Sequence, residues 1–398
     1  METQTAIDNN IESLEKQFAE HFSDTDKTVI VKSPASLTLL GDHTHYNDGL
    51  LIAAPLNTHT YLMMRKTKAD SFKIVFNGTA VPLKNLKEYN PSKSTNYTYT
   101  IIKRIFQTLI FRDLIKGGVE CVIVSEIPKS IGLGYYSSLQ IGLFKAAKKV
   151  FRLKLSDLEM IEIAHKIEQE FIGQISNKAN YFCSFFGKEN CLMLVDLREN
   201  THKCLKFNND EFCFIVFDTN LTIKNSENIC RTRIEECSVG VEALRLYIWG
   251  IKNLRDVNIE FLEKHINMTP QLVYKRCVYN VTEKQRVINA AKFIRTKKYN
   301  DFGNEIYDSF DSIVKHYELN YPELTKLVEE TKNIPDIIAA KSISCTPAKC
   351  IYTIVKTANC QKIIRSMKKR FEISGSTNTK LTAYKFSTSN GAKFITDK

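Results

Sequence analysis

The sequence predicts an α+β protein of two domains, and three observations support this. The chain has 398 residues, which is more than one compact core usually holds. With 43% hydrophobic and 25% charged residues, its composition is typical of a folded globular protein. Apolar, β-branched runs alternate along it with segments whose apolar residues recur every three or four positions. The domain change is expected near residues 195–210, which gives domains 1–200 and 201–398.

Local patterns place the individual elements. Segments whose apolar residues share one helical face, and which we expect to be helices, are 8–22, 96–114, 156–171, 231–244, 275–293 and 362–370. Ser156 is expected to cap the third of these. Segments rich in β-branched and aromatic residues, expected to be strands, are 58–65, 72–77, 119–124, 193–197, 212–217, 381–386 and 393–395.

Charge and cysteine content limit the class of protein. The formal net charge is +12, but the basic residues are spread along the chain, and the strongest cluster, Lys362–Arg370, has the spacing of an amphipathic surface helix. We therefore do not expect nucleic acid as a main partner. No apolar run approaches the roughly 18 residues of a membrane span, and no secretory signal is visible, so we expect a cytoplasmic protein with no membrane partner. The eleven cysteines form no C-x-x-C pair and are expected to be reduced core thiols.

The densest polar chemistry lies in Ser33–Asn57, SPASLTLLGDHTHYNDGLLIAAPLN. Apolar runs enter and leave this stretch, and six hydrogen-bonding side chains, Asp42 to Asn47, share the short turn between them. Two strands that hold a polar turn at a cleft suit a small polar ligand. A surface hairpin whose polar side chains meet only water has the same composition, so composition alone leaves both interpretations open.

The stretch resembles the N-terminal signature of galactokinases, in the GHMP kinase superfamily, which reads roughly P-G-R-x-N-L-I-G-E-H-T-D-Y-N-x-G. The positions that match are Pro34, Leu39, Gly41, His43, Thr44, Tyr46, Asn47 and Gly49. The positions that differ are Ala35, Ser36 (at the catalytic Arg), Thr38, Asp42 (at Glu) and His45 (at Asp). The resemblance implies a two-lobed fold with a cleft between an N-terminal and a C-terminal α/β domain. It also implies sugar contacts from Asp42, His43, Thr44 and His45.

A strand, a turn and a helix at Pro128–Ala147, PKSIGLGYYSSLQIGLFKAA, form an arrangement that can hold phosphate on backbone N–H groups. It resembles the family's phosphate loop, P-x-G-x-G-L-S-S-S-A. The resemblance implies nucleotide contacts from Ser130, Ile131, Gly132, Leu133, Gly134, Tyr135 and Tyr136. Both tyrosines are much larger than the serines they replace and should crowd the space for phosphates. Tyr136 stands where a small hydroxyl would ligate Mg²⁺.

Glu168 aligns with the metal-binding Glu of the family, although a solvated Glu on a charged helix face is an equal alternative. The segment Phe171–Arg198 resembles the family's stretch around M-D-Q, whose catalytic Asp falls on Asn180. A glycine three residues earlier in the family falls on Asn177, and a sugar-contacting Tyr falls on Cys230. Both positions are expected to line the sugar site.

The third family motif, R-M-T-G-x-G-F-G-G-C, is glycine-rich. Here it becomes KSISCTPAKC, Lys341 to Cys350, with every glycine lost and Pro347 added. A loop that needs glycine for close backbone approach cannot be assumed to keep its shape. With this third motif the resemblance extends over about residues 25 to 396.

The family reaction is the ATP-dependent phosphorylation of galactose at its 1-hydroxyl, with Mg-ATP. Asn180 cannot accept a proton, which forfeits roughly 10²–10⁴ in rate, and Ser36 removes a cation worth on the order of 10²–10³. We therefore expect a galactokinase-like protein, weakly active or inactive, that senses a small sugar or binds a protein partner. The alternative is a divergent but active galactokinase or related sugar 1-kinase. In that case Asp42, His43, His45 and Glu168 are the groups available for the chemistry.

Overall fold

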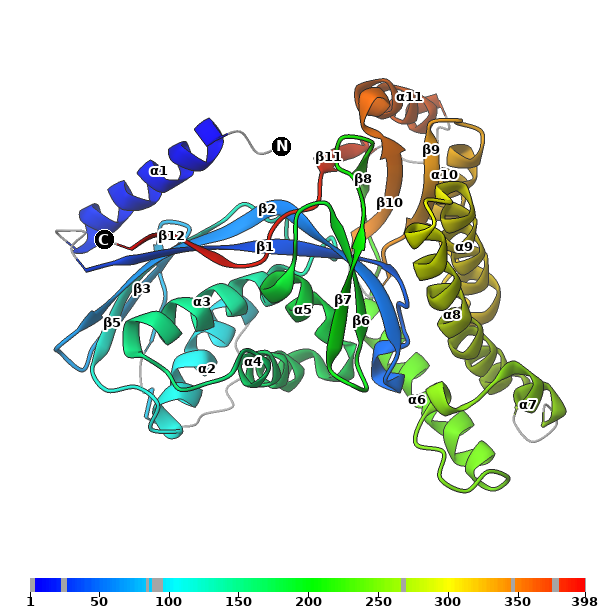
Figure 1. The fold of residues 1–398 in the computed structure, drawn as a ribbon, viewed down its shortest axis with the longest axis horizontal. Helices are drawn as coiled ribbons and strands as arrows, with labels where there is room; N and C mark the ends of the chain where they lie inside the picture. Colours follow the sequence, from blue (N-terminus) through cyan, green and yellow to red (C-terminus); the bar gives the residue numbers. More distant parts are fainter. Residues whose placement is uncertain are drawn as a thin grey trace.

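The computed structural model describes residues 4–22, 27–83, 86–87, 96–265, 270–344, 348–373 and 379–397. Two β-sheets with helices packed around them form an α+β fold, as predicted (Figure 1). The larger sheet has the strand order β12-β1-β2-β5-β3-β4, and β6 and β7 branch from β2. Its strands are β1 (Val29–Leu40), β2 (Leu50–Thr67), β3 (Phe72–Phe76), β4 (Thr79–Ala80), β5 (Gly118–Ser125), β6 (Cys191–Asp196), β7 (Thr201–Lys206) and β12 (Lys393–Asp397).

Helices cover both faces of the larger sheet (Figure 1). On one face, α1 (Gln4–Phe22) buries Leu14 and Phe18 against strand residues such as Tyr61 and Met63. On the other face lie α2 (Tyr97–Phe111), α3 (Tyr135–Phe151), α4 (Asp157–Ile172) and α5 (Lys178–Phe186). None of the helices in the described ranges is both long and apolar enough to cross a membrane.

The smaller sheet has the order β11-β8-β10-β9. Its strands are β8 (Phe212–Thr222), β9 (Ile337–Ser342), β10 (Ala348–Lys356) and β11 (Thr382–Phe386). The helices of this part of the chain are α6 (Ser226–Arg245), α7 (Ile259–Lys264), α8 (Gln271–Arg295), α9 (Tyr299–Ser312), α10 (Pro322–Lys332) and α11 (Cys360–Ile373). Helices α10 and α11 pack on one face, while side chains of α8 and α9 join the other face to the main hydrophobic core.

Periodicity predicted many of these elements. The predicted helices are confirmed as α1, α2, α4, α6, α8 and α11, and Ser156 caps α4 in a capping box with Glu159. The predicted strands correspond to β2, β3, β5, β6, β8, β11 and β12. Strand β7 has the sequence THKCLK and exposes nearly every residue, so it carries no apolar alternation that a sequence could reveal.

The last strand crosses the predicted division of the chain. Strand β12 pairs with β1 in the larger sheet, and β7, which begins at Thr201, belongs to that sheet too. The boundary at residue 200 stays a prediction. The chain nevertheless enters the smaller sheet only at Phe212 and returns to the larger one at its end.

The expectation that the cysteines are reduced is wrong for four of them. Disulfides join Cys191 to Cys204 and Cys213 to Cys360. The sequence could not reveal these pairs, because each joins residues that only the fold brings together. Six further cysteines among the described residues are buried and belong to neither disulfide, as expected.

A buried charge cluster joins the two parts of the molecule. The ammonium of Lys341, at the end of β9, is completely buried, and it lies 3.4 Å from Asp42 and 3.7 Å from Glu283 of α8. It also donates a hydrogen bond of 2.8 Å to Ser309 of α9. Glu283 in turn accepts the backbone N–H of Gly41, at 2.9 Å. The turn after β1 is therefore held by α8, α9 and β9.

The cluster should be essential for stability. Lys341→Met would leave the buried Asp42 carboxylate without a cation and Glu283 with Arg286 alone, and removing one partner of a buried ion pair costs about 3–5 kcal/mol. Lys148→Met, which removes an exposed ion pair to Asp157, should cost no more than about 1 kcal/mol. Urea unfolding of both variants measures the difference. Equal losses would mean that the cluster carries no special weight.

Candidate functional site

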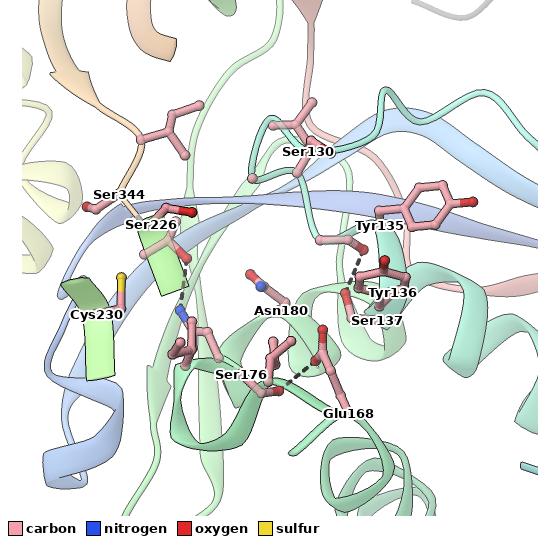
Figure 2. Close-up of a pocket in the computed structure, with 18 of the residues that line it drawn as sticks. Ser130, Tyr135, Tyr136, Ser137, Glu168, Ser176, Asn180, Ser226, Cys230 and Ser344 are labelled. Carbon is pink, nitrogen blue, oxygen red and sulfur yellow. Dashed lines mark hydrogen bonds between the residues drawn. The ribbon is translucent and has the colours of Figure 1, made fainter. Parts of the chain in front are cut away.

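A cavity of about 370 Å³ lies between the turn after β1, the turn before α3, helices α4 and α5, the start of α6, and the segment after β9 (Figure 2). The sequence-predicted residues that line it are Asp42, His43, His45, Ser130, Gly132, Leu133, Gly134, Tyr135, Tyr136, Glu168, Asn177, Asn180 and Cys230. Three other predicted site residues, Ser36, Thr44 and Ile131, are buried and do not line it.

Glycines and a threonine shape the turn after β1. Gly41 has φ +90°, and a Cβ there would lie 2.4 Å from the carbonyl oxygen of Leu50. The Thr44 hydroxyl donates a 2.7 Å hydrogen bond to the Gly41 carbonyl. A Cβ on Gly49 would lie 1.9 Å from that hydroxyl oxygen. Thr44 therefore sits beneath the turn and stabilises it, which is why it does not reach the cavity.

His43 is held by a tyrosine pair behind the cavity. Its Nδ1 lies 3.3 Å from the Tyr46 hydroxyl, which is 2.7 Å from the Tyr317 hydroxyl. Burial lowers the pKa of His43 well below its usual value, and the neighbouring His45 and Lys341 act in the same direction. The imidazole is therefore neutral at pH 7.

Asp42 is held by the segment that replaces the glycine-rich third motif. The Ser344 hydroxyl donates a 2.8 Å hydrogen bond to its carboxylate, and Lys341 lies 3.4 Å away. Burial raises the pKa of Asp42, while Lys341 opposes the rise. Sequence reasoning missed this contact. The signal was available: Asp42 and Lys341 stand at positions where the family signatures read Glu and Arg, so both charges are kept. Pro347 lies outside the described residues.

Two asparagines stand at the start of α5. The Asn177 side chain caps the helix by accepting the N–H of Ala179 at 3.0 Å, and it donates to the Thr38 hydroxyl at 3.2 Å. Asn180, in the first turn of the helix, points toward the centre of the cavity (Figure 2). Its amide can donate and accept hydrogen bonds but cannot take a proton at neutral pH.

The turn before α3 keeps a glycine-like backbone. Ser130, Gly132 and Gly134 have φ values of +67°, +78° and +61°, so Ser130 adopts the left-handed conformation although glycine is replaced there. Ser36 packs behind this turn and donates its backbone N–H to Leu133. A Cβ on Gly134 would lie 2.1 Å from the Ser36 hydroxyl oxygen. Position 36 therefore supports the turn from behind and supplies no cation.

The two tyrosines at the start of α3 point in different directions. Tyr135 is only 7% exposed and joins the main core, and its ring points away from the cavity (Figure 2). Tyr135 therefore contributes to the cavity wall while its ring points elsewhere than that of Tyr136, because successive helical residues lie about 100° apart. That the two rings crowd a phosphate stays a prediction. Tyr136 is half-buried on the cavity side. Burial and the nearby Glu168 raise the pKa of Tyr136 to about 12, so its hydroxyl stays protonated.

Glu168 is a buried carboxylate and not a solvated surface residue. One of its oxygens accepts hydrogen bonds from the Ser176 and Tyr181 hydroxyls, both at 2.6 Å. Burial raises the pKa of Glu168, and the two hydrogen bonds oppose the rise. Within the described residues, no group of three or more His, Cys, Asp or Glu side chains could hold a metal ion.

The cavity lining carries little positive charge. Lys129 is the one Lys or Arg among the described lining residues, against the carboxylates of Asp42, Glu168 and Glu227. The ammonium of Lys129 lies over the Tyr135 and Phe76 rings, at 5.1 and 5.5 Å from their centroids. The remaining polar lining consists mostly of hydroxyls, amides and imidazoles. Such a lining suits an uncharged, polar ligand better than an anion.

Comparison with known proteins finds matches over much of this chain. The model of the GHMP kinase N-terminal domain matches residues 96–188, and that of the galactokinase galactose-binding signature matches residues 16–66. The galactokinase of Clostridium perfringens is 23% identical over 90% of this chain and 93% of its own length. That of Thermotoga neapolitana is 24% identical over 86% and 93%.

Solved structures show the same fold. The galactokinase of Lactococcus lactis, crystallised with galactose, has a TM-score of 0.86 at 21% identity and covers 96% of this chain and 99% of its own. The mevalonate kinase of Methanococcus jannaschii has a TM-score of 0.60 at 16% identity, covering 92% and 99%.

The neutral state of His43 should make stability depend on pH. Because its pKa is lowered in the folded protein, unfolding takes up a proton below the ordinary value of about 6.5. Its contribution to stability is complete above that value and is lost by about 1.4 kcal/mol per pH unit below it. Urea unfolding at pH 7 and 5.5 should show a smaller pH dependence in His43→Gln than in the native protein. The exposed His21 is the control, and an equal effect of His21→Gln would contradict the assignment.

Proposed function

Because this chain belongs to the galactokinase family of the GHMP kinase superfamily, we propose that it binds a galactose-like sugar in the cavity but transfers phosphate weakly or not at all. It would then act as a sugar sensor, and its output would be an interaction with a partner protein. The observation that carries the proposal is the chemistry at two positions. Asn180 stands where the family has its catalytic Asp, and Ser36 where it has its catalytic Arg.

The cavity supports the binding half of the proposal. Its volume of about 370 Å³ lies within the range of small-molecule sites, which is about 300–1,000 Å³. Asp42, His43 and His45 line one side, and Asn177 and Asn180 line another, so hydrogen-bonding groups converge from several directions. The hydroxyls of a sugar both donate and accept hydrogen bonds. A sugar is also uncharged, so the Asp42 carboxylate does not repel it.

The loss of phosphoryl transfer follows from two missing groups. Phosphoryl transfer depends on positioning the reactants and on stabilising negative charge. The amide of Asn180 can orient a sugar hydroxyl but cannot remove its proton. Ser36 is completely buried behind the turn, so no cation reaches the cavity from that position. Together these losses should reduce a typical kinase turnover of about 1–100 s⁻¹ to below roughly 10⁻² s⁻¹.

The residues present fit Mg-ATP poorly. Glu168, at the metal-binding position of the family, has one carboxylate oxygen already engaged by Ser176 and Tyr181. Tyr136 places a large ring where a small hydroxyl would ligate the metal. A triphosphate would also meet Glu168 and Glu227, in a lining whose described residues include one lysine. We therefore assign no step of a reaction to Mg-ATP.

One observation favours the alternative of a divergent, active sugar kinase. Ser130, Gly132 and Gly134 keep left-handed backbone angles, so the turn before α3 still directs backbone N–H groups from the start of a long helix. If a phosphate reached this turn, His45, which lines the cavity, would be the available base. The same cavity would then hold both sugar and nucleotide.

Sugar binding without turnover is the expected result. Galactose at 100 times its dissociation constant should stabilise the protein by about 2.7 kcal/mol and raise the melting temperature by a few degrees. An ADP-release assay with galactose, other hexoses and amino-hexoses should show no sugar-dependent turnover above background. Turnover near 1 s⁻¹ with any sugar would replace the proposal with the divergent kinase. If none of these sugars raised the melting temperature, the proposal that the cavity binds a sugar would be contradicted.

Magnesium ATP should leave the melting temperature unchanged at millimolar concentration. If the Tyr136 ring is the obstacle, Tyr136→Ser should create a magnesium-dependent rise of a few degrees. Tyr135→Ser is the matched control: it removes a neighbouring ring that points away from the cavity, so it should lower stability without creating nucleotide binding. A magnesium-dependent shift in the native protein would contradict the poor fit. If magnesium ATP raised the melting temperature of neither variant, the loss of nucleotide binding would be assigned to the missing glycines of the third motif.

A further inference from the structure

Positive charge is concentrated at one end of this chain. Residues 341–398 contain twelve Lys and Arg but only two Asp and Glu, a net charge of +10 out of +12 for the whole protein. The basic residues are therefore less evenly spread than expected. The first 340 residues are nearly neutral, so the excess belongs to β9, β10, α11, β11 and β12.

The fold presents part of this excess on one surface, which we call the α11 basic face. It consists of Lys362, Arg365, Lys368 and Lys369 on α11 and Lys385 on β11, all of them exposed. Lys385 pairs with Ile215 of β8, and Ile215 faces α11, so Lys385 projects from the same side of the sheet. In Figure 1, α11 lies at the outer end of the smaller sheet, with β11 beside it.

These cations have no ion-pair partner in the part of the chain that the structure describes. None of the five forms an ion pair with any residue in the described ranges, whereas Arg370, on the flank toward α10, pairs with Glu330. Glu372 is the one acidic residue within α11. Five unpaired cations on one face repel each other, and a bound polyanion would relieve that repulsion.

The spacing of the cations fits a phosphate backbone. Lys362, Arg365 and Lys369 are three and four residues apart and form one row along the helix. The row spans about 10.5 Å at 1.5 Å per residue. A strand of duplex DNA carries one phosphate per about 3.4 Å of axis, so about three phosphates lie within that length. The three cations of the row therefore match about three phosphates in number, and the two sets of charges extend over the same length.

Other polyanionic partners fit less well. The apolar side of α11, formed by Ile363, Met367 and Phe371, is buried against the smaller sheet, so no apolar side chain is free to enter a bilayer. The described residues after 340 include no exposed large hydrophobic or aromatic side chain on which unpaired bases could stack. The phosphate backbone of a duplex can be bound through charge alone, with no apolar or stacking contact.

We propose that the α11 basic face binds duplex nucleic acid through its phosphate backbone, without sequence preference. This function is separate from the sugar cavity, because no residue of the face lines it. Binding should be weak at physiological salt, with a dissociation constant in the range of about 10⁻⁴–10⁻⁶ M for non-specific contacts, and it should strengthen steeply as salt is lowered.

Fluorescence anisotropy of a labelled 20-base-pair duplex, at salt concentrations from 50 to 200 mM, tests the proposal. The variant Lys362→Gln/Arg365→Gln/Lys369→Gln should lower the slope of log K against log salt by about 2.7, which corresponds to three lost phosphate contacts. A matched triple, Lys68→Gln/Arg112→Gln/Lys116→Gln, removes the same charge from exposed positions near the larger sheet and should leave the slope unchanged. The charge-conserving triple Lys362→Arg/Arg365→Lys/Lys369→Arg should bind like the native protein.

Several results would overturn the proposal. One is no binding of the native protein at 50 mM salt. Another is an equal loss in the two glutamine triples, which would reflect net charge alone. A third is loss of binding in the charge-conserving triple, which would indicate that the fold of α11 matters and its charge does not. Tighter binding of polyglutamate, or of vesicles containing anionic lipid, would assign the face to a different partner.

Discussion

The burial of the Lys341 ammonium is the constraint on which the cavity depends. A lysine with no exposed surface must be neutralised by carboxylates and satisfied by hydrogen-bond acceptors, or it would not be charged there. Asp42, Glu283 and the Ser309 hydroxyl meet this need, and they come from three different elements. Because Glu283 also accepts the N–H of Gly41, the turn that carries His43 and His45 cannot move independently of α8 and β9.

The same cluster explains how a degraded motif can still shape a site. The segment after β9 contains none of the glycines of the motif that it resembles. Ser344, in that segment, instead hydrogen-bonds the Asp42 carboxylate and lines the cavity. This segment is thus tied to the turn after β1 by a side-chain contact. This contact fixes the Asp42 wall of the cavity without any glycine in the segment.

Sequence patterns predicted what depends on local chemistry. Apolar spacing identified six helices, and Ser156 with Glu159 forms the expected capping box. The motifs also identified most of the residues that meet at the cavity. The sequence could not show in which direction each side chain points. Tyr135 and Tyr136 are adjacent and chemically alike, yet one ring enters the core and the other faces the cavity. Ser36 and Thr44 lie in the signature, but the fold places both of them behind the turns that they support.

The distribution of charge separates two ways in which an anion could meet this protein. The described lining of the cavity has one lysine against three carboxylates, so it offers a nucleotide little attraction without a metal. The cations that could attract phosphate lie outside it, on α11. A phosphate would be attracted to α11 by exposed charges, so salt and free magnesium should both weaken its binding there. Binding in the cavity would instead need magnesium to offset the carboxylates, and burial would shield it from salt. The sign of the magnesium dependence therefore tells which surface a phosphate-bearing ligand occupies.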